Sequence, residues 1–135
     1  MNDKDTHAEL VMRFRRASGL SVMRSKEYLR AGDADLVNRI LAAYDRQVAP
    51  NAEYRPVLHD PIEDDPRYAK AFAEAEEEAQ RDYERSREEW RRLFPDGGNY
   101  YGYGRRCYVK QCILRERFGI DWKTPREMNP CVIFE

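Results

Sequence analysis

Apolar residues recur every three or four positions between Asp65 and Phe94, and this spacing predicts one long helix. Asp65 can cap the N-terminus, Pro66 suits the first helical position, and neither Gly nor Pro occurs again before Pro95. At about 1.5 Å per residue the helix would be roughly 43 Å long, so we expect other helices to pack along it. The stripe expected to face a core consists of Tyr68, Phe72, Ala75, Ala79, Tyr83, Ser86, Trp90 and Leu93.

The N-terminal part, residues 1–49, shows the same spacing in three shorter segments, which predicts three helices. Thr6 and Glu9 have the form of a capping box for the first helix, which Gly19 ends. Ser21 and Asp33 can cap the second and third helices. The residues expected to face the core are Leu10, Val11, Phe14 and Ala17, then Val22, Met23, Tyr28 and Leu29, then Leu36, Val37, Ile40, Leu41, Tyr44 and Val48.

The remaining chain is expected to contain a strap, a final helix and a short C-terminal turn. Residues 50–65 carry prolines at intervals of five or six, so they are predicted to form an ordered, irregular strap held by Tyr54, Val57, Leu58 and Ile62. A helix over 105–118 ends at Gly119, and Thr124–Pro125 starts a short turn. The apolar tail, residues 131–134, should dock on the core. We therefore predict an all-α single domain over 1–135, with a three-helix subunit (1–49), a strap (50–65) and a third part (66–135), about six helices in all.

Two stretches resemble known proteins. Residues 14–29, with Gly19, Leu20, Lys26 and Leu29 as markers, resemble the first two helices of a UBA-like three-helix unit. The N-terminal domain of bacterial elongation factor Ts and the C-terminal domain of the ribosomal stalk protein have similar patterns. This resemblance, taken over 8–48, implies a small helical binding module. Residues 118–130 are similar to endings of small bacterial proteins associated with toxin–immunity gene neighbourhoods, which implies an immunity-type role.

Charge is abundant but nearly balanced. Charged residues make up 36% of the 135 residues, with a formal net charge of −1, which argues against a dedicated nucleic-acid binder. The balance shifts along the chain, since residues 51–80 contain 3 basic and 9 acidic residues and residues 81–135 contain 12 and 9. Three cysteines and no long apolar run favour free thiols, a cytoplasmic location and no membrane span.

Two groups of residues are candidates for binding. Glu74, Glu77, Glu78 and Asp82 could form an acidic docking face for a basic protein partner, or a solvated helix face with pairs such as Glu77–Arg81. The second group, which we call the Tyr/Arg loop, could stack bases, contact a protein, or cover a helix junction. It consists of Tyr100, Tyr101, Tyr103, Arg105 and Arg106.

Catalytic and metal chemistry have little support in the sequence. Cys107 and Cys112 point about 140° apart on a helix, and no Cys-x-x-Cys or His pair occurs, so we expect no metal and no cofactor. His59 with a cysteine is the remaining enzymatic alternative. The leading prediction is a non-enzymatic protein-binding protein, and the specific role that we expect is an immunity-type antitoxin that uses the acidic face. The alternative is a translation-associated or nucleic-acid-binding module that uses the Tyr/Arg loop. The oligomeric state is left open.

Overall fold

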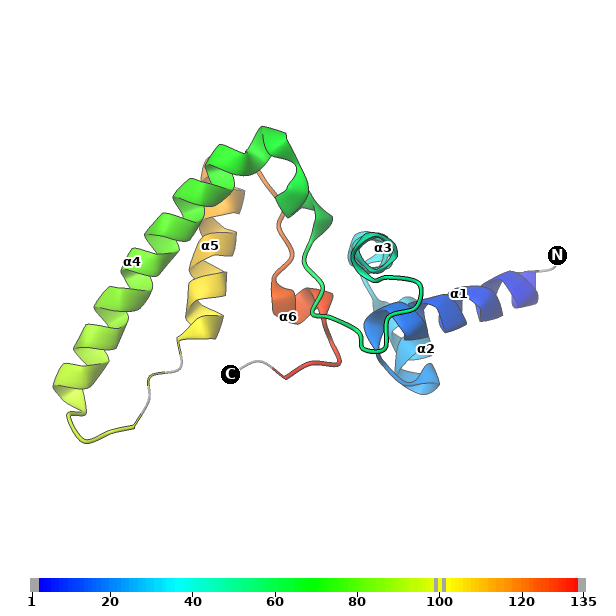
Figure 1. Ribbon diagram of the computed structural model, residues 1–135, viewed down its shortest axis with the longest axis horizontal. Coiled ribbons are helices and arrows are strands. Elements are labelled where there is room, and N and C mark those ends of the chain that lie inside the picture. Colours follow the sequence, from blue (N-terminus) through cyan, green and yellow to red (C-terminus); the bar gives the residue numbers. More distant parts are fainter. Residues whose placement is uncertain (1–2, 99, 101, 134–135) are drawn as a thin grey trace. The chain divides into compact units, whose positions relative to one another are not determined.

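The computed structural model describes residues 3–98, 100 and 102–133, with side chains from Thr6 onward, and within these ranges it contains no β-strand. The prediction of an all-α fold is confirmed (Figure 1). No helix in the described ranges is long and apolar enough to cross a membrane. The helices are α1 (Asp3–Ser18), α2 (Val22–Ala31), α3 (Ala34–Gln47), α4 (Ala69–Leu93), α5 (Tyr103–Phe118) and α6 (Pro125–Met128), with 3₁₀ turns η1 (Pro61–Asp64) and η2 (Pro66–Tyr68).

The chain divides into two compact units, each with its own buried core. Unit 1 comprises the described residues of Met1–Pro61 together with Pro125–Ile133, and unit 2 comprises those of Ile62–Thr124. The C-terminal helix α6 therefore belongs with the N-terminal helices. Whether the two units act as the single predicted domain stays a prediction.

Unit 1 is built around α1, which packs against both α2 and α3, while α6 packs against α3. Phe14 is fully buried, and its ring lies 5.5 Å from that of Tyr28. The predicted caps of α2 and α3 are confirmed, because Ser21 Oγ accepts a hydrogen bond from the backbone N–H of Arg24 and Asp33 accepts one from Asp35. The buried core is completed by Ala17, Leu20, Leu36, Val37, Ile40, Leu41, Ala43, Leu58 and Met128.

Several residues of unit 1 differ from the sequence-based expectation. The capping box at Thr6 is wrong, because α1 extends back to Asp3 and Thr6 lies inside it. Met23 on α2 and Tyr54 on the strap are 72% and 80% exposed, although both were expected to face the core. The short helix α2 buries Ser25 and half-buries Tyr28 and Leu29, so its opposite side faces water. Leu10, Val22 and Val57 are also exposed.

Polar contacts, as well as the buried side chain of Leu58, hold the part of the strap that belongs to unit 1. Asn129 is fully buried beside the backbone of Leu58 and bonds both its N–H and its C=O. Arg55 donates from Nε to the carbonyl of Ala17 at 2.7 Å. The buried carboxylate of Asp60 pairs with Arg39 of α3 at 2.6 Å. The strap is thereby tied to α1, to α3 and to the residue that follows α6.

Unit 2 is an antiparallel helix pair in which α4 and α5 lie side by side (Figure 1). Asp65 caps the 3₁₀ turn before α4, not α4 itself, because its side chain accepts from the N–H of Arg67. Gly119 ends α5 with φ 65°, and the N–H of Ile120 bonds the carbonyl of Leu114, as a glycine C-cap predicts. The core consists of Ala71, Ala75, Leu114, Ile120 and Trp122.

The apolar stripe of α4 is confirmed at its centre and wrong at its end. Ala75 and Ala79 are fully buried, but Leu93 is 67% exposed. Because α4 has 25 residues and α5 has 16, α5 cannot cover both ends of α4. The C-terminal tail also differs from expectation, since Ile133 is 90% exposed and Phe134 lies outside the described residues.

Candidate protein-binding surface

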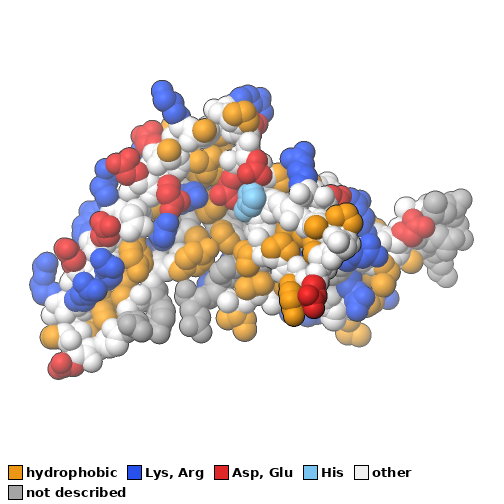
Figure 2. Space-filling model, viewed as in Figure 1, with side chains coloured by type: hydrophobic (Ala, Val, Ile, Leu, Met, Phe, Trp, Pro, Cys, Tyr) orange, Lys and Arg blue, Asp and Glu red, His pale blue; other side chains and the backbone are white. Residues whose placement is uncertain are grey.

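Ion pairs between α4 and α5 engage most of the predicted acidic face. Arg117 of α5 lies 3.0 Å from both Glu74 and Glu78, and Arg105 lies 2.8 Å from Asp82. Glu77 pairs within α4 with Arg81, as predicted. All four carboxylates predicted to bind a partner are therefore already paired within unit 2, and the docking role of this face stays a prediction. Figure 2 shows acidic and basic side chains alternating along the exposed edge of α4.

Glu76 extends this arrangement toward the core of unit 2. It pairs with Arg106 and with Lys110, whose Nζ is 2.9 Å away. Lys110 is only 13% exposed and lies 4.5 Å from the ring centre of Trp122. Glu76 belongs to the same run of acids, for which the sequence predicts a side away from the aromatic stripe. This prediction is wrong for Glu76, which is half-buried and pairs with two residues of α5. The half-buried Glu76, the largely buried Lys110 and the ring of Trp122 form a polar contact that joins α4 and α5.

The pKa values of the paired carboxylates predict a loss of stability at acid pH. Burial raises the pKa of Glu76, but Arg106 and Lys110 outweigh burial and hold it below its ordinary 4.5. Arg105 lowers the pKa of Asp82 below its ordinary 3.8. A carboxyl group whose folded-state pKa is depressed stabilises the fold fully above its unfolded-state pKa, and this contribution is lost as the pH falls through the folded value.

We therefore expect Glu76→Gln with Asp82→Asn to lower the free energy of unfolding of unit 2 by about 1 kcal/mol at pH 7. The loss should shrink as the pH falls below about 4, where the native carboxylates become protonated. Urea unfolding at several pH values measures both effects. The control is Glu84→Gln with Glu88→Gln, two exposed carboxylates of α4 that form no ion pair among the described residues. An equal loss in both variants at pH 7 would contradict the prediction.

The Tyr/Arg loop is largely occupied by contacts within unit 2. The ring of Tyr100 lies 5.5 Å from Tyr83 and 6.0 Å from Trp90. A Cβ atom at Gly102 would meet both the Tyr100 and the Tyr83 ring at under 3.0 Å, so glycine lets the chain pass close to them. Tyr100 thus covers the helix junction, one of the alternatives considered above.

The other members of the Tyr/Arg loop are also engaged or undescribed. Arg105 and Arg106 are paired with Asp82 and Glu76. Tyr103 is hydrogen-bonded to Cys107, and burial raises the pKa of its hydroxyl to about 12. Tyr101 lies outside the described residues. The two arginines therefore already have carboxylate partners, and phosphate groups would have to compete with them.

The thiols and His59 do not come together as a reactive pair in any contact of the described residues. Burial raises the pKa of the Cys107 thiol, which disfavours the nucleophilic thiolate. The backbone of His59 exchanges hydrogen bonds with the Gln47 side chain, which fixes this part of the strap against α3. The described side chains include no cluster of three or more His, Cys, Asp or Glu that could hold a metal.

A strongly basic segment of unit 1 was missed by the sequence analysis. From Met12 to Arg30 the chain contains six cations and a single acid, Glu27. The cations are all exposed, and exposed apolar residues lie between them, including Met12 at 45% and Met23 at 72%. We call this range the basic α1–α2 segment; its cations are Arg13, Arg15, Arg16, Arg24, Lys26 and Arg30.

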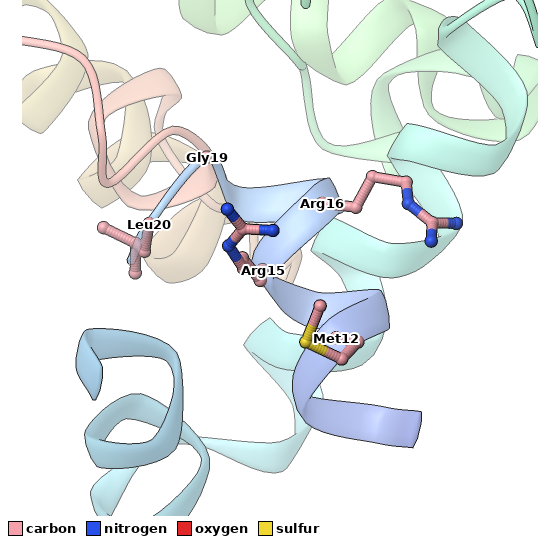
Figure 3. A pocket seen from close by; sticks show the side chains of 5 residues that line it. All are labelled: Met12, Arg15, Arg16, Gly19 and Leu20. Atoms are coloured by element: carbon pink, nitrogen blue, oxygen red, sulfur yellow. The ribbon is translucent and has the colours of Figure 1, made fainter. Parts of the chain in front are cut away.

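A hollow with a volume of about 250 Å³ opens within this segment, where α1 ends (Figure 3). In Figure 3, Arg15 lies between Met12 and Leu20, and Arg16 extends in another direction. Gly19 lines the hollow with φ 76°, and a Cβ atom there would lie 2.6 Å from the sulfur of Cys131. Glycine is therefore required at this position both for the turn and for the approach of the C-terminal segment.

No family model, curated protein or solved structure matches this chain. The resemblances to UBA-like units over 8–48 and to proteins of toxin–immunity neighbourhoods therefore stay predictions.

A local charge count could have found the basic α1–α2 segment from the sequence. Residues 1–50 together contain 9 basic and 7 acidic residues, so a window of that length hides the imbalance. Acidic residues lie on both sides of the basic α1–α2 segment, including Asp3, Asp5, Asp33 and Asp35. A charge count over a window about as long as two short helices would have distinguished the basic stretch from the acidic residues on either side.

Proposed function

We propose that this chain is a non-enzymatic protein that binds another protein through its basic α1–α2 segment. The observation that carries the proposal is that α1 and α2 expose six cations and several apolar side chains, and that two of these cations, Arg15 and Arg16, line a hollow at the end of α1. Exposed methionines adapt their shape to a partner, and arginine is enriched at protein interfaces. Arg15 and Arg16 have no ion-pair partner among the described residues, so their guanidinium groups are available to a binding partner.

The lining of the hollow supports binding over catalysis. It offers a thioether, an aliphatic side chain, a glycine and two guanidinium groups. Arginine keeps its proton at all ordinary pH values, so it orients and neutralises anions but does not serve as a general base. The chemistry of these groups fits the recognition of a partner.

A protein partner is favoured over nucleic acid by the character of the apolar groups. Proteins that bind single strands present aromatic faces on which bases stack. In the basic α1–α2 segment the exposed apolar residues are Met12, Val22 and Met23, while Tyr28 is half-buried against Phe14. The Tyr/Arg loop offers tyrosines, but its arginines are paired with carboxylates of α4.

The test is capture of partners from a native lysate by the full chain and by two matched charge-reversal variants. Arg15→Glu with Arg16→Glu changes two residues in the last turn of α1. The control, Arg46→Glu with Arg115→Glu, changes two exposed last-turn arginines of α3 and α5. We expect a protein retained by the wild type and the control and lost from the α1 variant. Equal retention by all three chains would refute the proposal.

The same experiment separates this proposal from the acidic-face hypothesis. Reversal of Glu74, Glu77 and Glu78 to lysine should leave the captured partner bound if the basic α1–α2 segment is the contact. Loss of the partner with this variant, together with a slower association rate at low salt, would instead support the acidic face. An immunity-type antitoxin role requires the captured partner to be a toxin, which identification of the partner by mass spectrometry decides.

A further inference from the structure

We infer that the partner presents an acidic segment whose apolar side chain enters the hollow lined by Met12, Arg15, Arg16, Gly19 and Leu20. This inference rests on the proposed function and names the chemistry of the occupant. The hollow combines an apolar part, Met12 and Leu20, with a cationic part, Arg15 and Arg16. An occupant that satisfies both parts carries an apolar anchor and neighbouring carboxylates.

The two arginines of the hollow differ from Arg13 and Arg39, two other arginines of unit 1, in their surrounding charge. Arg13 lies 2.9 Å from Asp45, and Arg39 lies between Asp35 and Asp60. These arginines already have carboxylate partners, whereas Arg15 and Arg16 have none among the described residues. A guanidinium group prefers the planar, bidentate geometry of a carboxylate. An acidic partner segment would supply the missing anions.

The apolar part of the hollow distinguishes such a segment from a general polyanion. Met12 is 45% exposed on the rim, whereas Leu20 is 5% exposed. Methionine packs adaptably against aliphatic and aromatic side chains. A phosphate backbone would engage the arginines but would leave the exposed Met12 without an apolar partner. Binding that depends on Met12 as well as on Arg15 therefore identifies the peptide chemistry.

The shape of α1 near its end explains why the hollow is preformed. The guanidinium of Arg55 donates to the carbonyl of Ala17, and the N–H of Gly19 bonds the carbonyl of Arg15. These contacts fix the last turn of α1 and the start of the loop to α2. A partner segment would meet a hollow whose backbone is already ordered, so little ordering entropy is lost on binding.

The experiment selects short peptides from a random displayed library against the full chain. We expect the selected sequences to carry an aliphatic or aromatic residue flanked by Asp or Glu. For a selected peptide, Met12→Ala should weaken binding about tenfold and Arg15→Glu more than tenfold, as measured by fluorescence anisotropy. The controls are Val57→Ala, which truncates an exposed apolar residue of the strap, and Arg46→Glu, and both should bind within about twofold of the wild type.

Two results would overturn the inference. One is a set of selected peptides without acidic enrichment, or acidic peptides whose binding ignores Met12 and Arg15. The other is a labelled single-stranded or double-stranded DNA that binds through Arg15 while acidic peptides do not.

Circular dichroism of each variant verifies that α1 remains folded. Polyglutamate, which has the charge without the anchor, should bind at least about tenfold more weakly than the selected peptide.

Failure of this inference is distinguishable from failure of the proposed function. If lysate capture depends on Arg15 and Arg16 but the selected peptides lack acids or ignore Met12, the proposed function stands and the acidic-segment chemistry is refuted. If selection yields acidic, anchored peptides that need both residues but the α1 variant captures the same lysate proteins as the wild type, the peptide chemistry stands and the proposed function is refuted.

Discussion

Replacement of Asn129 with alanine is expected to lower the free energy of unfolding of unit 1 by about 3 kcal/mol or more. The Asn129 side chain is fully buried and makes four hydrogen bonds. Its amide group exchanges bonds with both the N–H and the C=O of Leu58, each at 2.7 Å, and so takes the place of a neighbouring β-strand. It also bonds the carbonyl of Pro125 and the guanidinium of Arg55.

The large effect follows from what alanine leaves behind. Leu58 is fully buried, so neither its N–H nor its C=O can readily turn to water once the amide is gone. Each buried polar group without a partner costs about 1–3 kcal/mol. Asn129→Asp should also destabilise unit 1 at pH 7, because a carboxylate accepts from Leu58 N–H but repels the Leu58 and Pro125 carbonyls that the amide now donates to.

Urea unfolding followed by circular dichroism measures this loss. The matched control is Asn38→Ala, the same substitution at an exposed position of α3, which should change the unfolding free energy by no more than about 0.5 kcal/mol. If Asn129→Ala proves as mild as Asn38→Ala, the strap is not held by this amide. The stabilising free energy then has to come from the apolar contacts of Leu58 and from the bonds of Arg55, His59 and Asp60.

The regular part of this fold could be predicted from the sequence because its signals are local. The spacing of apolar residues, the caps at Ser21 and Asp33 and the glycine C-cap at Gly119 each depend on residues within one or two turns. The error at Thr6 has the same origin, since a capping box is a local pattern that a preceding helical turn can override. Local patterns therefore place helices well and their first residues less well.

The contacts that hold each unit together are not local and could not be predicted in this way. The bonds between Asn129 and Leu58 could not be predicted, because Leu58 is 71 positions away along the chain. The acidic stretch of α4 was interpreted as a solvated or docking face, because pairs such as Glu74 with Arg117 join residues 43 positions apart. The charge and polarity of one helix do not reveal which cations of a neighbouring helix will lie beside its carboxylates.

The candidate binding residues show the same difference between local signals and contacts that join distant parts of the chain. The predicted set lies where acids and arginines are most conspicuous in the sequence, and these groups pair with one another inside unit 2. The hollow is formed where α1 ends and the chain turns at Gly19, so no periodic pattern identifies it. Its charge, however, is a local property, and a shorter counting window over residues 12–30 would have marked it.

Replacement of Trp122 with alanine is expected to lower the free energy of unfolding of unit 2 by about 4 kcal/mol. The side chain is 2% exposed, and its ring lies 6.4 Å from that of Phe72 in an edge-on arrangement. The ammonium of Lys110 lies over the same ring at 4.5 Å. Alanine would remove the ring from the core and leave Lys110 beside a cavity instead of an aromatic face.

Trp122→Phe separates packing from hydrogen bonding. Nε1 of Trp122 is buried and has no hydrogen-bond partner among the described residues. Phenylalanine therefore removes an unsatisfied donor while keeping an aromatic face for Lys110, and the loss should be only about 1–2 kcal/mol. If the phenylalanine variant were as unstable as the alanine variant, the indole N–H would have to be contributing a bond, contrary to this structure.

The two tryptophans of the chain provide a control within the same unit. Trp90 is half-buried near the end of α4, where it contacts Phe94 and Tyr100. Trp90→Ala should cost less than half as much as Trp122→Ala, because a partly exposed ring loses less on truncation. The fluorescence of the remaining tryptophan reports on unit 2 in each variant. If the order of the two losses were reversed, the centre of unit 2 would lie at the free end of α4 and not between Lys110, Phe72 and Trp122.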